Sequence, residues 1–335
     1  MARAPTDVTE PDVVAGVERI LIIKLGALGD FVQALGPMAA IRRHHATNPG
    51  GAHVVLLTSK PYVDLAEASG LVDEVWIDEE RPKPWQIGRV RRLRQKLKSG
   101  NFTRVYDLQT SDRSNFYFHI LGPGHRPEWS GIARGCSHPH ANPRRDDMHT
   151  IERQREQLAA AGIDGVPMSD LGFAAKDIAQ FGIEKPFTLL VPGGAPHRPA
   201  KRWPAEHYAA LANRLFAQGV TPVLLGARAE QAILGLIERD APGTVNLCGK
   251  TDFLDIAVLA RGAALAVGND TGPMHLISLA GCASVVLYSH DSDPKLCAQR
   301  GPRVEILRRD SLENLSQDDV WTAVEMLLPD ALTGG

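Results

Sequence analysis

The chain has 335 residues, of which 44% are hydrophobic and 23% are charged, and its formal net charge is −2. This composition is typical of a soluble globular protein, the length suits two domains rather than one, and the near-neutral charge argues against nucleic acid as a partner. The four cysteines are scattered and form no Cys-x-x-Cys pair. That pattern favours reduced thiols in a cytoplasmic protein over a disulfide or zinc framework.

Residues 1–16 are polar and carry two prolines, which predicts an irregular leader. A secretory signal would need an apolar segment after a positive start, and this stretch has none. Further along, no apolar run reaches the length of a membrane span. We therefore expect a cytoplasmic protein.

The globular part opens with an apolar run, 19–24, followed by a glycine-containing turn that ends at Asp30. Such a run is typical of a strand buried on both faces of a parallel sheet. Apolar residues then recur at helical spacing to Arg43, and Pro37 is expected to kink this helix or shorten its first turn. Asp30 would lie where α/β folds bind ligands, although a plain helix N-cap is the favoured explanation from these residues alone. The turn lacks the third glycine of a dinucleotide fingerprint, so a nicotinamide cofactor is not expected.

Apolar segments alternate with helical patterns in both halves of the chain, and this alternation predicts two doubly wound parallel sheets. The polar run 164–184 separates an expected N-terminal domain, 18–170, from a C-terminal domain, 185–330. Strands are predicted at 53–58, 74–77, 104–108, 187–191, 221–225, 244–247, 263–267 and 283–288, with a last helix at 317–328.

Two segments of the N-terminal half are unusually basic. Residues 81–98 carry eight Lys or Arg and no carboxylate, which suits a solvated helix face or a helix that meets an acidic surface. Residues 122–147 are rich in Gly, Pro, Arg and His and are predicted to form a long irregular loop. The possible metal ligands in and just after this stretch fit no standard zinc spacing, so we expect no metal; they are His138, His140, Asp146, Asp147 and His149. A basic acceptor loop is preferred, built from Arg126, Arg134, Arg144 and Arg145.

Three turns of the C-terminal half combine glycine or charge with a helix start. Gly193 and Gly194 follow a predicted strand, and Lys201 precedes a helix, an arrangement that suits a phosphate but also a basic surface loop. Glu230 begins a helix and either accepts hydrogen bonds from a ribose or complements the helix dipole. The run 268–275 reads as strand, tight turn and helix, with Asp270 or Thr271 as N-cap, and is a ready anion site.

Together these segments resemble glycosyltransferase family nine, the lipopolysaccharide heptosyltransferases. The resemblance rests on 22–30, on Pro192-Gly193-Gly194 with the Lys-x-Trp-Pro run at 201–204, on Gly226 with Glu230, and on the Asp-Thr-Gly-x-x-His element at 270–275. It covers the chain from about residue 18 to residue 328.

The resemblance implies an α/β fold of the GT-B type, with two facing Rossmann-like domains and the active site in the cleft between them. The C-terminal domain would hold ADP-heptose as a substrate, no cofactor or metal would be used, and the anomeric centre would be inverted. The N-terminal domain would bind an acidic glycolipid acceptor at the inner membrane surface, and the last helix would pack back onto it. By position, Asp30 is the implied general base, Lys201 the diphosphate clamp and Glu230 a ribose ligand. The other implied substrate-binding residues are Gly29, Gly193, Gly194, Asp270, Thr271, Gly272 and His275.

This chain departs from the family's usual sequence at two places, and both leave the identity of the substrates open. The family commonly has Gly-Pro-Thr-Asp-Pro after the last strand, where this chain has the run Ser289–Pro294, and Ser or Thr often follows the early lysine, where this chain has Leu25–Leu28. Two alternatives therefore stay open beside heptosyl transfer to lipopolysaccharide inner core. One is a GT-B enzyme with another nucleotide sugar, such as an epimerase, and the other is a non-catalytic nucleotide- or glycan-binding protein.

Overall fold

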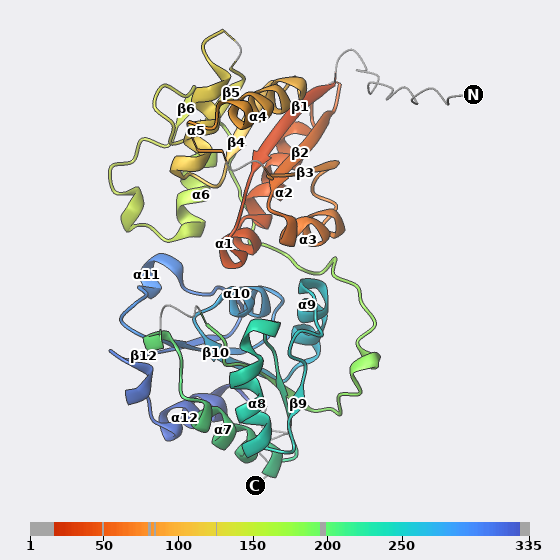
Figure 1. Cartoon of the computed structure of the whole chain (residues 1–335), viewed down its shortest axis with the longest axis vertical. Coiled ribbons are helices and arrows are strands. Elements are labelled where there is room, and N and C mark those ends of the chain that lie inside the picture. The colour runs from red at the N-terminus through yellow and green to blue at the C-terminus, as the bar shows by residue number, and fades with distance from the viewer. Residues whose placement is uncertain are drawn as a thin grey trace, which may run out of the picture.

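The computed structural model describes residues 17–48, 50–79, 82–83, 85–124, 126–194 and 199–328. The expected leader, 1–16, lies outside the described residues, as do Arg81 in the basic segment and residues 197–198 beside Lys201. Two α/β domains lie one above the other along the long axis of the molecule, the N-terminal domain in red to yellow-green and the C-terminal domain in green to blue (Figure 1).

The N-terminal domain is built on a six-stranded sheet in which all neighbouring strands are parallel. Its strands, in spatial order, are β3 (Glu74–Ile77), β2 (Ala52–Thr58), β1 (Glu18–Ile23), β4 (Arg104–Asp107), β5 (Glu128–Gly131) and β6 (His138–Pro139). The run Ile20–Ile23 is fully buried at the centre, as expected for a strand covered on both faces. Its helices are α1 (Leu28–Gln33), α2 (Leu35–His45), α3 (Val63–Ala68), α4 (Ile87–Ser99), α5 (Asp112–Leu121) and α6 (Thr150–Ala159).

The C-terminal domain repeats this plan with a second six-stranded parallel sheet. Its strands, in spatial order, are β12 (Val304–Arg308), β11 (Ser284–Tyr288), β10 (Leu265–Asn269), β7 (Phe187–Val191), β8 (Thr221–Leu224) and β9 (Val245–Asn246). Its helices are α7 (Ala205–Ala217), α8 (Gln231–Asp240), α9 (Phe253–Gly262), α10 (Gly272–Leu279), α11 (Pro294–Cys297) and α12 (Gln317–Leu327). The expected doubly wound class is therefore confirmed.

The strand orders create one topological switch point in each sheet. In the N-terminal sheet the chain moves outward from β1 to β3 and then returns so that β4 pairs with the other side of β1. In the C-terminal sheet β10 returns to pair with β7 in the same way. The loops that follow two such strands diverge to opposite sides of the sheet, which opens a crevice at the carboxyl ends of the strands. Each domain is therefore expected to have one binding crevice, at the switch point of its sheet.

Several expectations on local structure are corrected. The stretch 122–147 is not one irregular loop, because β5 and β6 within it extend the sheet. The strand β12 was not predicted. The helix expected from residue 31 to Arg43 is divided at Ala34, and Pro37 lies in the first turn of α2, where its missing N–H costs nothing.

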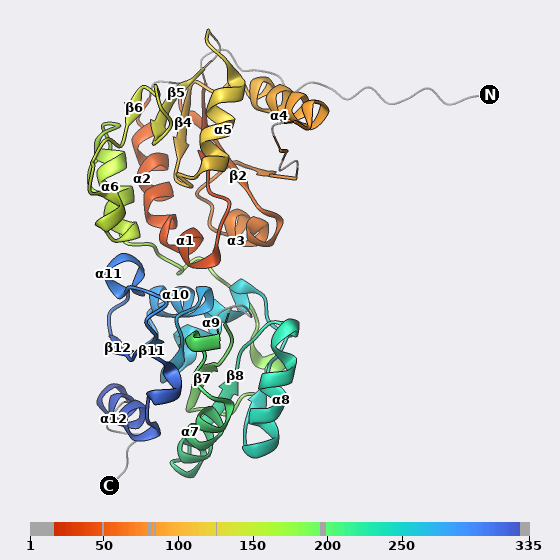
Figure 2. The same ribbon diagram turned by 60° about the vertical axis from the view of Figure 1, so that its left-hand side comes forward.

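The last helix, α12, packs on α7 and on strands β10 and β11, and not on the N-terminal domain as the resemblance implied. Its buried face joins the core of the C-terminal domain through Val320, Trp321 and Val324. Figure 2 shows α12 next to α7, at the end of the molecule away from the N-terminal domain. Polar side chains on the rest of the helix face solvent or pair with Arg214 and Arg309.

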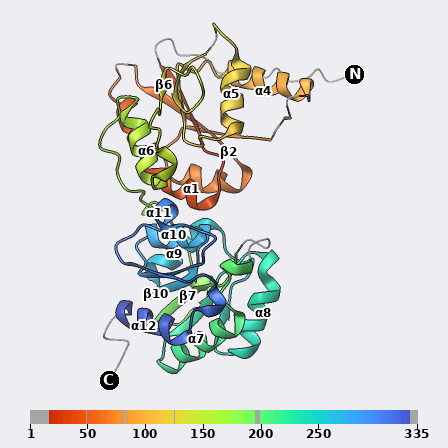
Figure 3. The same ribbon diagram turned by 90° about the vertical axis from the view of Figure 1, so that its left-hand side faces the viewer.

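Helices α1 and α10 form the closest contact between the domains (Figure 3). Two glycines permit this approach. A Cβ on Gly29 would lie 2.5 Å from His275 Cδ2, and a Cβ on Gly272 would lie 2.7 Å from Leu28 Cβ. Any larger residue at either position would push the helices apart.

Candidate active site

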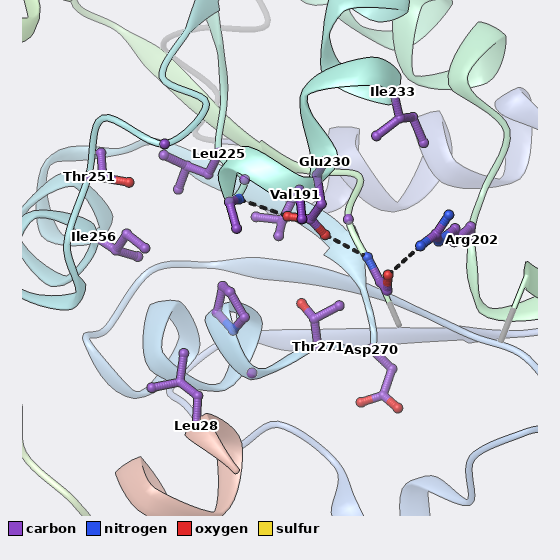
Figure 4. Close-up of a pocket in the computed structure, with 18 of the residues that line it drawn as sticks. Leu28, Val191, Arg202, Leu225, Glu230, Ile233, Thr251, Ile256, Asp270 and Thr271 are labelled. Carbon is purple, nitrogen blue, oxygen red and sulfur yellow. Dashed lines mark hydrogen bonds between the residues drawn. The ribbon is translucent and has the colours of Figure 1, made fainter. Parts of the chain in front are cut away.

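A pocket of about 700 Å³ lies at the switch point of the C-terminal sheet. Its walls come from the loops after β7, β8 and β10 and from the first turns of α8 and α9, and Leu28 reaches it from α1 (Figure 4). The pocket therefore belongs mainly to the C-terminal domain, but it is closed on one side by the N-terminal domain. Of the substrate-binding residues that the sequence predicts, those lining it are Gly193, Gly194, Lys201, Glu230, Asp270, Thr271 and Gly272.

Glu230 fastens two loops of this pocket together. Its Oε1 accepts a hydrogen bond from the Gly194 N–H at 2.9 Å, and its Oε2 accepts one from the Ala227 N–H at 2.8 Å (Figure 4). A Cβ on Gly193 would lie only 1.8 Å from Oε1, so glycine is required there. Glu230 ends a short 3₁₀ turn, Arg228–Glu230, just before α8. The carboxylate thus fixes the shape of the pocket even in the absence of a ligand.

Lys201 and Asp270 form an ion pair at the pocket wall, with Lys201 Nζ 2.8 Å from Asp270 Oδ2. Ser292 Oγ donates to the same oxygen at 2.7 Å, and Gln299 Nε2 donates to Oδ1 at 3.1 Å. Burial raises the pKa of Asp270, but these bonds from Lys201 and Ser292 outweigh it and hold that pKa below its ordinary value. Ser292 lies in the run that departs from the family pattern, and it keeps a hydroxyl on Asp270.

The first turn of α10 has the strand–turn–helix geometry that the sequence predicts. Thr271 is the N-cap, with an extended backbone, and its side chain makes no capping bond. Pro273 lies in the first turn, as predicted. Since an N-terminal turn carries free N–H groups and the positive end of the helix dipole, this end of α10 offers donors to an oxyanion in the pocket.

Asn269 was not among the predicted site residues, yet it orders this part of the site. It is fully buried at the end of β10. Its Nδ2 donates to the carbonyls of Pro192 and Gly193, while its Oδ1 accepts from the Trp203 N–H and the Tyr208 hydroxyl. The side chain thereby fixes the glycine loop and the segment bearing Lys201 against each other. The Asn-Asp-Thr-Gly run was the available signal, but only the fold shows what the asparagine bonds.

Asp30 lies in the first turn of α1 and is not its N-cap, which is Ala27. The plain capping interpretation is therefore wrong. Asp30 lines a second cavity, at the switch point of the N-terminal sheet, and not the first pocket. Among the described residues its carboxylate makes no hydrogen bond, so its oxygens are free to accept one from a ligand hydroxyl.

Gly29 and His275 were predicted to bind substrate, but they contact each other and neither lines the pocket. The buried His275 ring accepts a hydrogen bond on Nδ1 from Gln33 Nε2, at 2.8 Å, across the domain interface. Burial lowers the pKa of His275 to about 4 in spite of the nearby carboxylates of Asp270 and Asp30. The imidazole is therefore neutral at pH 7, and both residues join the domains.

This pKa shift predicts a pH dependence of stability. In the unfolded chain His275 binds a proton below its ordinary pKa of 6.5, but in the folded chain it does so only below about 4. Since the unfolded state binds more protons in that window, the free energy of unfolding should fall from pH 6.5 to pH 4, by roughly 3 kcal/mol from this group alone. The contribution is fully present above pH 6.5.

The measurement is urea unfolding of the wild type and His275→Gln between pH 7 and pH 4.5. The difference in free energy of unfolding between the two proteins should shrink as pH falls. Asp107 has a pKa raised to about 6 by burial and acts with the opposite sign, but it is present in both proteins and cancels. Parallel pH curves would show that His275 does not stay neutral.

The remaining polar and basic candidates serve other contacts. Within the described residues, no group of three or more His, Cys, Asp or Glu is placed to hold a metal ion. His149 caps α6 and bonds to the Ala298 carbonyl across the domain interface, and Arg126 lies over the Phe118 ring. Of the four arginines of the expected acceptor loop, Arg145 alone lines the cavity beside Asp30.

The basic helix α4 lies on the N-terminal domain at the end away from the interface (Figure 2). Leu93 and Leu97 bury one face of it, while Trp85 and Ile87 at its start are exposed. None of the helices in the described part of the chain is long and apolar enough to cross a membrane.

Comparison with known proteins matches a family model described as glycosyltransferase family 9 (heptosyltransferase) over residues 90–320. Lipooligosaccharide heptosyltransferase 2 of Haemophilus ducreyi (strain 35000HP / ATCC 700724) is 30% identical over 212 residues, 55% of this chain and 61% of the relative. Lipopolysaccharide heptosyltransferase 2 of Escherichia coli (strain K12) is 27% identical over 236 residues, 62% of this chain and 65% of the relative. The chain thus spans somewhat less than two thirds of the length of these relatives.

Two solved structures share the fold over nearly their whole length. E. coli ADP-heptose LPS heptosyltransferase II superposes with a TM-score of 0.72 at 22% identity, covering 92% of this chain and 98% of that one. The family 9 glycosyltransferase of Veillonella parvula DSM 2008 does so with a TM-score of 0.77 at 19% identity, covering 92% and 97%. These likenesses confirm the expected GT-B arrangement, and together with the family match over most of its length they show that this chain belongs to glycosyltransferase family 9, the heptosyltransferases.

Proposed function

We propose that this chain is an inverting glycosyltransferase that moves a heptose from an ADP-sugar to a hydroxyl of lipopolysaccharide inner core. The observation that carries the proposal is the convergence of Lys201 and the free first-turn amides of α10 on one pocket at the switch point of the C-terminal sheet. The curated relatives are heptosyltransferases of lipooligosaccharide or lipopolysaccharide, which supports this choice of sugar and acceptor.

The donor-side residues suit a nucleoside diphosphate. Lys201 and the amides at Thr271 and Gly272 would bind the diphosphate, and Glu230 would accept from a ribose hydroxyl while keeping its bonds to the loop amides. Apolar side chains that line the pocket from α8 and α9, Ile233, Phe253 and Ile256, would contact the base. The ADP-sugar is the substrate in this proposal, and no cofactor or metal takes part.

The reaction would proceed by one displacement. The acceptor hydroxyl oxygen attacks the anomeric carbon, the bond from that carbon to the β-phosphate oxygen breaks, and Asp30 takes the hydroxyl proton. ADP leaves with one more negative charge. Lys201 and the α10 amides would therefore stabilise the transition state more than the bound donor. The contact between α1 and α10 brings the two crevices together and would exclude water from the donor.

The proposed acceptor is an acidic glycolipid, so we place the reaction in the cytoplasm at the surface of the inner membrane. The exposed basic face of α4, with Trp85 and Ile87 exposed at its start, supports a peripheral contact with anionic lipid.

Calorimetric titration with ADP, UDP, GDP and NAD⁺ tests the donor side. We expect ADP to bind selectively, and Lys201→Ala to raise its Kd about 10- to 100-fold, because a charge-assisted bond is lost and Asp270 is left unpaired near the diphosphate. Lys185→Ala removes an exposed lysine of the same domain outside the pocket and serves as the matched control. Preference for UDP or GDP would point to another nucleotide sugar.

Transfer itself is tested with an ADP-heptose donor and heptose-deficient lipopolysaccharide. Release of ADP that depends on the acceptor is the expected result. Release without an acceptor would instead indicate an epimerase-like reaction, and binding without turnover would indicate a nucleotide-binding protein.

A further inference from the structure

The second cavity, of about 240 Å³, lies at the switch point of the N-terminal sheet, the counterpart of the place that the donor pocket occupies in the other sheet. Asp30 is on its wall. The loop after β4 forms one side, and Arg145 and Asp146 with the first two turns of α6 form the other. Its charged lining residues are Lys24, Asp30, Arg145, Asp146 and Arg153. Three cations thus face two carboxylates.

Neutral partners hold the three cations in place. The Lys24 side chain is 3% exposed and donates to the Leu108 carbonyl at 3.0 Å. Arg145 Nη2 donates to Thr110 Oγ1 at 3.1 Å, and Arg153 Nη2 donates to Thr150 Oγ1 at 3.0 Å. These bonds orient the cations without neutralising them, which is the arrangement of a site for an anion.

Asp146 is the carboxylate that faces the two guanidinium groups. Its Oδ1 lies 3.1 Å from Arg145 Nη1 and 3.9 Å from Arg153 Nη1, while the side chain is 84% exposed. An ion pair as exposed as this one is weak and easily exchanged. In the same cavity the buried Gln154 Oε1 has no hydrogen-bond partner among the described residues. A ligand hydroxyl would satisfy that oxygen.

We propose that this cavity binds a carboxylate or phosphate group of the acceptor between Arg145 and Arg153, and that Asp146 is an internal competitor for the same two guanidinium groups. The proposal rests on the proposed function for the identity of the acceptor, but not for the site itself. Binding there would hold an acidic sugar beside Asp30. It would also set acceptor affinity through a residue that touches neither the donor nor the reacting atoms.

The test uses three probes on the full chain saturated with ADP: glucuronate for a carboxylate, glucose 6-phosphate for a phosphate, and glucose as the uncharged control. We expect Asp146→Asn to lower the Kd of the bound anion about two- to fivefold, and Arg153→Gln to raise it about tenfold. Asp147→Asn is the matched control, because it removes the same charge from the same turn but makes no ion pair among the described residues, and its Kd should stay within a factor of 1.5.

If Asp146→Asn lowers and Arg153→Gln raises the Kd of glucuronate, the acceptor group is a carboxylate. If the two variants do so for glucose 6-phosphate, it is a phosphate. The proposal is overturned if Asp146→Asn leaves the Kd unchanged, if Asp147→Asn lowers it equally, or if neither anion binds better than glucose. These are binding measurements, so failure of ADP selectivity or of heptosyl transfer would be seen separately. With a competent acceptor, Asp146→Asn should lower KM by the same factor and leave kcat unchanged.

Discussion

Replacing Asp30 by asparagine is expected to lower kcat by about 10²- to 10⁴-fold, the usual contribution of a positioned general base. Asparagine keeps the shape of the side chain but cannot take the acceptor proton. Asp30 lines the cavity of the N-terminal domain and not the donor pocket, so the Kd of ADP should stay within about twofold of the wild-type value. Single-turnover transfer and calorimetry on the same preparation measure the two quantities.

Asp64→Asn provides the matched control for this variant. Asp64 lies in the first turn of α3, the helix after β2 in the same sheet, but it is exposed and lines neither cavity. The variant Asp64→Asn should retain wild-type kcat. If Asp30→Asn also turned over at nearly the wild-type rate, Asp30 would not be the base. If Asp30→Asn lost ADP affinity together with kcat, the role of Asp30 would be structural.

Trp203→Ala should cost about 3–5 kcal/mol of folding free energy, the usual loss when a buried tryptophan is truncated. The side chain is 0% exposed, its Nε1 donates to the Leu315 carbonyl at 2.9 Å, and its ring packs edge-on against Tyr208. For a domain of this size the loss corresponds to a fall in melting temperature of roughly 10 °C. Calorimetric melting of both proteins measures it.

Trp85→Ala controls for the loss of an indole. Trp85 is 71% exposed, so its truncation should change the free energy of unfolding by less than about 0.5 kcal/mol. Trp203 follows Lys201 by two residues, and its backbone N–H is held by Asn269. Trp203→Ala should therefore weaken ADP binding even where the domain stays folded. A variant that melts like wild type would show that the cavity is refilled by its neighbours.

The central strands could be predicted from the sequence because they are buried on both faces and read as continuous apolar runs, as in Ile20–Ile23 and Phe187–Val191. Three strands were missed because they lack such a run. β5 lies inside the sheet but has only four residues, among them Ser and Gly. The edge strand β6 is two residues long, and the edge strand β12 is half-exposed and includes two charged residues. The stability of such strands depends on their neighbours more than on their own sequence.

The pocket of the C-terminal domain was also accessible from the sequence, because each of its turns is a local pattern of strand end, glycine and helix start. The cavity of the N-terminal domain was not. Lys24 directly follows β1 and Arg153 lies in α6, so these cavity residues are far apart in the chain and only the fold brings them together. Likewise, nothing local shows that Gly29 faces His275, because that contact depends on the docking of two domains.

Within the described residues the chain passes between the domains once, through residues 160–186, and the packing of α12 on its own domain adds no second crossing. That segment is tied to both sides: Ser169 bonds α1 and α2, and Arg261 of α9 donates to the carbonyls of Leu171 and Ala174. The described part of the chain therefore has one covalent joint between two domains that otherwise meet through α1 and α10. We expect that one domain could be exchanged for that of a relative at this joint only if the small residues where α1 meets α10 are kept.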